Sequence, residues 1–205
     1  MLGHTHALFG LTTLAAVHSG TLAISGHTAG GLIQPHPVAG LPVGPFLCAG
    51  AAVLGALLPD LDAGEATIHH ELGPVTGLIR LGLEVCGVQH RGVLHSGLAT
   101  IVVLGLATLI GGWYGYADVG LALGLGYFSH VVLANALTIS GVPLVWPVSA
   151  RRCHLLPRRF RIRTGGPVEP LIFGLVAVVL IWLLPALLPT ELADLLDQFI
   201  VGLFL

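Results

Sequence analysis

Histidine and aspartate side chains stand at the ends of long apolar runs in this sequence, where their nitrogen and oxygen atoms could bind a metal ion. Imidazole nitrogen and carboxylate oxygen together form the ligand set that zinc, manganese or iron takes in proteins. Ionisable side chains are costly to hold at a membrane boundary, so their presence there indicates function. The candidate ligands are His6, Asp60, His90, His95 and His130.

The spacing of these residues indicates how they would be used. Asp60 and Asp62 follow a proline, which disfavours helix at the residue before it, so we expect an extended turn that points both carboxylates in one direction. On that turn Asp62 would be a further ligand or a general base. His90 and His95 are five residues apart and would diverge by about 140° on one helix. We therefore expect His90 on a loop and His95 on the first turn of a helix, both facing one pocket.

Arg91 lies between these two histidine positions, at the boundary of the next apolar run. Its guanidinium group is always charged, and its forked geometry matches a phosphate or a carboxylate. We expect Arg91 to neutralise negative charge on a substrate.

The composition places the chain in a lipid bilayer. Of its 205 residues, 55% are hydrophobic and only 9% are charged, whereas a soluble domain carries about 25% charged residues. The 29 glycines are typical of membrane helices that pack closely through small side chains. The three cysteines are isolated, so neither a disulfide framework nor a cysteine zinc site is indicated. We predict one integral membrane domain over residues 1–205.

Five apolar runs are candidates for crossing the membrane, which takes about 20 helical residues. They cover residues 7–24, 38–58, 93–113, 119–139 and 168–188. Residues 75–88 predict an amphipathic helix that lies at the membrane interface. Residues 192–205 form a tail that is amphipathic at first and short for a crossing. The expected fold is an all-α, polytopic membrane helix bundle with about five transmembrane helices and additional interfacial helices.

All basic residues fall between two pairs of these runs. There is no lysine, and six of the eight arginines lie in residues 140–167, while the other two lie in residues 60–92. Short arginine-rich loops stay cytoplasmic, so both segments and the N-terminus are predicted to be cytoplasmic. The candidate ligands then gather on the cytoplasmic face. The arginine cluster itself is most simply a topology determinant and an anchor for lipid headgroups.

Five motifs occur in order along the chain, at residues 5–10 (THALFG), 58–62 (LPDLD), 90–96 (HRGVLHS), 126–130 (GYFSH) and 141–147 (GVPLVWP). Together they resemble the YdjM-like family of bacterial inner-membrane, metal-dependent hydrolases. The resemblance runs from His6 to about Glu169, and residues 164–169 look like the family segment before its last span. It implies a bacterial inner-membrane location, a divalent metal ion (zinc or manganese), and Glu169 as an extra polar group.

The sequence departs from the family pattern after His130. The family places an aspartate four residues after this histidine, where this chain has Ala134, and Asn135 follows three residues before Thr138. Either one residue has been inserted or the aspartate has been replaced. Asn135 can still bind a metal through its carbonyl oxygen, but it adds no negative charge and should weaken a divalent site.

The leading functional hypothesis is a membrane hydrolase that acts through metal-activated water on a lipid or phosphate-ester substrate. One alternative is a non-catalytic membrane scaffold that retains a degenerate metal site. Another is a metal permease or sensor, which would need ligands at several depths, and His18 is the candidate for the middle of the first run. We otherwise expect His18, His27 and His36 to hydrogen-bond to a backbone carbonyl. Membrane lipids, and no nucleic acid, are the expected partners; the sequence does not indicate an oligomeric state.

Overall fold

The computed structural model describes residues 1–25, 31–39, 41–63, 73, 76–78, 81–82, 92–188, 192–193, 195 and 198. Helices dominate these residues, which confirms the all-α prediction. The long helices are α1 (Gly3–Ser25), α2 (Gly44–Leu57), α5 (Gly97–Trp113), α6 (Ala117–Phe128) and α7 (Val168–Leu187). The short ones are η1 (Leu58–Asp62), η2 (Val93–His95), η3 (Ser129–Ala134), η4 (Asn135–Leu137) and η5 (Arg158–Phe160). A small antiparallel pair, β1 (Pro37–Val38) and β2 (Leu41–Pro42), completes the fold.

Three stretches of the described chain are long and apolar enough to cross a membrane, namely Gly44–Asp62, Ala117–Leu137 and Val168–Leu187. Helix α5 is apolar but shorter, with 17 residues, and α1 has 23. The second run begins its helix at Gly44 rather than at residue 38, because the residues before it pair as β1 and β2. Of the predicted interfacial helix at 75–88, residues 76–78 and 81–82 are helical and the others lie outside the described residues. Most of the 192–205 tail also lies outside them.

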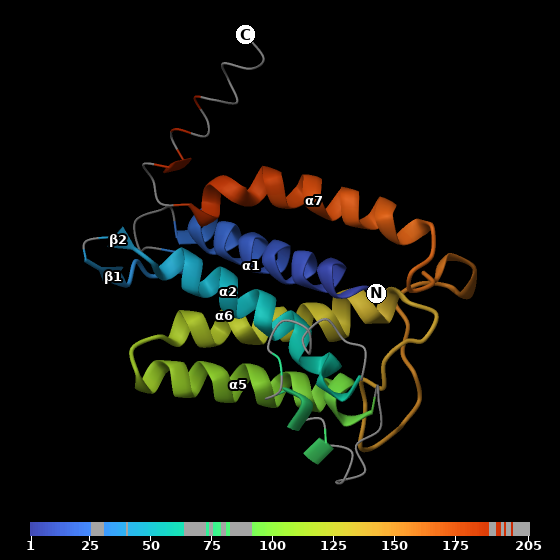
Figure 1. The fold of residues 1–205 in the computed structure, drawn as a ribbon. Helices are drawn as coiled ribbons and strands as arrows, with labels where there is room; N and C mark the ends of the chain where they lie inside the picture. The colour runs from blue at the N-terminus through green and yellow to red at the C-terminus, as the bar shows by residue number, and fades with distance from the viewer. Residues whose placement is uncertain are drawn as a thin grey trace.

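The five long helices lie side by side in the order α7, α1, α2, α6, α5 (Figure 1). Helices α1, α5 and α7 run in one direction and α2 and α6 in the other. The starts of the first three therefore meet the ends of the other two, at the end of the bundle where the N-terminus lies. We call this the metal end, because the candidate ligands stand at these helix termini.

Glycines let the backbones of α2 and α6 touch. A Cβ atom added at Gly55 would lie 2.0 Å from the Leu123 carbonyl oxygen, and one added at Gly126 would lie 2.0 Å from the Ala52 carbonyl oxygen. Small residues allow this close approach of membrane helices. Because η1 follows α2 and η3 follows α6, the crossing brings Asp60 close to the residues that follow α6.

Apolar side chains cover the outside of the bundle as well as its inside. The buried cluster includes Leu14 and Ala122, whereas Leu171 on α7 and Trp182 further along it are 73% and 78% exposed. A soluble protein rarely exposes such a continuous apolar face. The outer surface of α7 is therefore suited to lipid.

Candidate metal centre

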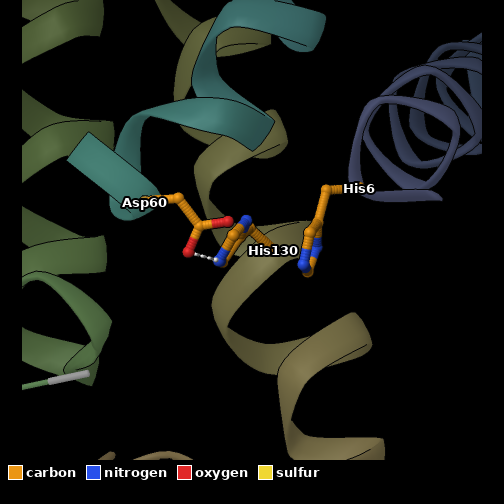
Figure 2. Close-up of side chains that lie close together, drawn as sticks. All are labelled: His6, Asp60 and His130. Carbon is orange, nitrogen blue, oxygen red and sulfur yellow. Dashed lines mark ion pairs between the residues drawn. The ribbon is translucent and has the colours of Figure 1, made fainter. Parts of the chain in front are cut away.

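Three predicted ligands, His6, Asp60 and His130, meet at the metal end. Each offers one ligand atom, and the three atoms lie within 4.8 Å of one another. Figure 2 shows the side chains pointing toward each other from α1, η1 and η3. His6 and His130 are almost fully buried, while the Asp60 side chain is 19% exposed. The carboxylate is thus the one member of the cluster that solvent reaches.

His130 is oriented by the end of α2. Its Nδ1 atom lies 2.6 Å from the Ala56 carbonyl oxygen. A carbonyl can only accept, so Nδ1 carries the proton and the lone pair of Nε2 is left for the cluster. That Nε2 atom lies 3.5 Å from Asp60 Oδ1. Ligating histidines are commonly fixed in this way by a hydrogen bond from the other ring nitrogen.

His95 joins the cluster from η2, just before α5. Its Nε2 atom lies 3.4 Å from Asp60 Oδ1 and 3.3 Å from His130 Nε2. The Tyr127 hydroxyl donates to the Leu94 carbonyl, which ties this turn to α6.

His6 reaches the site by stacking on His130. The two ring centroids are 3.8 Å apart and the planes differ by 20°. Within the part of the chain that the structure describes, the buried Nδ1 atom of His6 has no hydrogen-bond partner. A buried polar atom without a partner is costly, and a divalent ion beside Asp60 would satisfy it. Three imidazoles and a carboxylate fit zinc or manganese.

The aspartates of η1 do not share a direction, contrary to the extended turn predicted for them. Leu58–Asp62 is a 3₁₀ helix that continues α2. A proline is accepted in the first turn of a helix, where its missing N–H is not needed. Asp60 therefore points into the cluster (Figure 2), and Asp62 is buried. Asp62 remains a predicted ligand or base.

The spacing between His130 and Asn135 is explained by a π-helical turn, which sequence reasoning missed. Ser129–Ala134 is a π-helix, and the Asn135 N–H donates to the His130 carbonyl five residues back. A π turn holds one residue more than an α turn, so Asn135 takes the place that the fourth residue takes in an α-helix. This favours an inserted residue over a simple replacement. The Asn135 Oδ1 atom is buried and has no partner among the described residues.

Glu169 has a positioning role that the sequence only hinted at. Its carboxylate accepts the Leu2 N–H and the Gly165 N–H, the second at 2.7 Å. Glu169 is itself buried in the first turn of α7. It therefore fixes the start of α1, and with it His6, against α7.

Two other predicted site residues, His90 and Arg91, lie outside the described residues and stay predictions. Among the remaining histidines, His18 Nδ1 accepts the Ile33 N–H at 3.3 Å, so this nitrogen bonds to a backbone amide and not to the expected carbonyl. His36 instead pairs with Asp118, its Nε2 2.8 Å from Oδ1, at the start of α6. His27 lies outside the described residues. A permease would need His18 as a metal ligand near the middle of the membrane. The Nδ1 atom of His18 is already engaged by the backbone N–H of Ile33.

The chain is similar to bacterial inner membrane proteins. A family model described as "YdjM inner membrane protein" matches residues 1–192. Proteins named "Inner membrane protein YdjM", from Escherichia coli (strain K12) and from Shigella flexneri, are each 37% identical over 99 residues, which is 47% of this chain and 47% of theirs. The similarity thus spans about half the length of these curated relatives. No solved structure matches the chain.

Proposed function

Because the chain belongs to the family of YdjM inner membrane proteins, we propose that it is a membrane-bound, metal-dependent hydrolase. The observation that carries the proposal is the cluster of His6, Asp60 and His130, whose ligand atoms lie within 4.8 Å of one another. Zinc or manganese is the proposed ion, with His95 as a further ligand. A bilayer protein with so few charged residues has little reason to bury this set unless it binds something.

In this proposal some residues of the site bind the metal ion, and others act on the substrate. A bound divalent ion supplies acidity to water and polarises a phosphoryl or acyl oxygen. His130 is held in the correct tautomer by Ala56, and the partly exposed Asp60 marks the side from which a substrate enters. Asp62 is the candidate general base, and Arg91 is the candidate group for neutralising substrate charge.

Hydrolysis is tested with the purified full chain, a bacterial lipid extract and added zinc or manganese. Turnover should appear with metal, disappear with a chelator, and be absent in the His130→Ala protein. Metal-loaded protein that turns over no lipid and no phosphate ester would support the scaffold alternative instead.

Restoring a carboxylate at Asn135 is expected to tighten metal binding. The Asn135→Asp protein gains a negative charge at the position of the buried amide oxygen. Because the affinity of a site for a divalent ion rises with the negative charge of its ligands, we expect the affinity to increase by about tenfold or more. Competition with a metal-sensitive dye measures the affinity, and Asn135→Ala, which removes the oxygen, should bind more weakly than the natural protein. If all three proteins bind equally, Asn135 is not a ligand. Hydrolytic activity in the Asn135→Asp protein, with none in the natural protein, would favour the scaffold alternative.

We also propose that the chain crosses the membrane five times, with its N-terminus and its metal end in the cytoplasm. The six arginines of residues 140–167 all follow α6 at the metal end, and short arginine-rich loops stay cytoplasmic.

Cys153 tests this orientation because it lies in the arginine-rich segment and is partly exposed. In a protein that carries Cys48→Ala and Cys86→Ser, a membrane-impermeant maleimide should label Cys153 in inverted vesicles and not in right-side-out vesicles. Labelling from the outside alone would reverse the proposed orientation.

A further inference from the structure

The arginine-rich segment 140–167 covers the metal end of the bundle (Figure 1). Its backbone is fastened there at several points. The Leu155 N–H donates to the Ala136 carbonyl at 2.8 Å, and the Ile162 N–H donates to the Leu137 carbonyl at 3.0 Å. The Gly97 N–H, two residues after His95, donates to the Leu144 carbonyl at 3.0 Å. The segment is therefore a fixed surface beside the site.

This surface is strongly positive. It holds six arginines and no aspartate or glutamate. Arg152 and Arg161 donate to the backbone carbonyls of Gly141 and Leu156. Over the described residues, none of the six pairs with a carboxylate. Arg158 and Arg159 are exposed, so their guanidinium groups can contact an external anion.

Exposed apolar side chains lie in the same segment as these arginines. Val148 is 88% exposed and Phe160 is 58% exposed. Arg159 lies over the Phe160 ring, with its guanidinium carbon 4.8 Å from the ring centroid. The turn η5 presents Arg158, Arg159 and Phe160 outward, while the neighbouring Ile162 is buried and anchors it.

We propose that this surface binds the phosphate groups of anionic phospholipids in the leaflet at the metal end. Arg158 and Arg159 hold the phosphate, and Phe160 and Val148 reach the boundary between headgroups and acyl chains. A soluble phosphate compound would use the arginines but leave the apolar side chains in water, so the mixture favours a lipid. If the proposed hydrolase function holds, on which this last step rests, the substrate class is a phosphate-bearing lipid.

The test uses the full chain in nanodiscs that contain phosphatidylcholine and phosphatidylglycerol, with bound lipids counted by native mass spectrometry. The natural protein should retain phosphatidylglycerol in preference to phosphatidylcholine. Each arginine near a membrane surface contributes about fivefold in affinity, so the Arg158→Gln/Arg159→Gln protein should lose most of that preference. Arg158→Lys/Arg159→Lys keeps the charges and should keep much of it.

Equal retention of the two lipids by the natural protein, or an unchanged preference in the glutamine variant, would overturn the proposal. Displacement of the bound lipid by glycerol phosphate alone would do so as well, because the ligand would then be a soluble phosphate. The His130→Ala protein separates the two proposals, since its lipid preference should match that of the natural protein. If the natural protein prefers phosphatidylglycerol but binds no metal, the lipid-binding proposal stands and the hydrolase proposal fails.

Discussion

Purified His130→Ala protein should contain almost no bound zinc or manganese. His130 supplies the Nε2 lone pair that lies 3.5 Å from Asp60 Oδ1, in a ring fixed by Ala56. Loss of an outer partner of a metal ligand already costs about 10- to 100-fold in affinity, so removal of a ligand should exceed that range. Elemental analysis of the purified natural and variant proteins measures the effect. The Asp60→Ala and His95→Ala proteins should behave in the same way.

His4→Ala is the matched control for a second ligand variant, His6→Ala. Both histidines lie in the first turns of α1, but His4 is exposed and its ring packs edge-on against Phe173, with centroids 5.4 Å apart. The His4→Ala protein should keep its metal and the His6→Ala protein should lose it. Full metal occupancy in the His6, Asp60 and His130 variants would show that the cluster is not the binding site.

The Gly55→Ala protein should be strongly destabilised. Its new methyl group would lie 2.0 Å from the Leu123 carbonyl oxygen, and a backbone carbonyl cannot turn away as a side chain can. Overpacking of a core costs about 1–3 kcal/mol, and we expect the upper end here because α2 must separate from α6. Metal affinity should fall too, since Asp60 and His130 follow these two helices. Thermal unfolding in detergent, with and without metal, measures both effects.

Gly50→Ala is the control on the same helix. A Cβ atom at Gly50 meets nothing within 4 Å, and alanine has a better helix propensity than glycine by up to about 1 kcal/mol. Its unfolding temperature should be unchanged or higher. Similar unfolding temperatures for the Gly50→Ala and Gly55→Ala proteins would mean that α2 and α6 do not touch at Gly55.

Hydropathy and arginine placement indicated which candidate ligands would lie at one end of the bundle. Long apolar runs fix which residues end a helix, and the loops that carry arginine fix which helix ends share a side. These two constraints place His6, Asp60, His95 and His130 together before any packing is known. The structure brings these four side chains into one cluster.

Local backbone geometry at the site could not be predicted in the same way. The proline before Asp60 suits either an extended turn or the first turn of a 3₁₀ helix, and the structure has the second. The π-helix around His130 directly follows α6, and the apolar pattern of this run does not predict it. Its one trace in the sequence is the additional residue between His130 and Asn135. The hydrogen bond from the Leu2 N–H to the Glu169 carboxylate joins residues far apart in the chain. The spacing of residues in the sequence therefore does not predict it.

Anomalous X-ray diffraction from crystals of the metal-loaded protein tests the central claim most directly. Data collected at the absorption edge of the metal identified by elemental analysis should give one strong peak among His6, Asp60 and His130, within bonding distance of the three ligand atoms. A peak at the opposite end of the bundle, for example beside His36 and Asp118, would contradict the assigned site. So would the absence of a peak among the three residues in protein that carries stoichiometric metal.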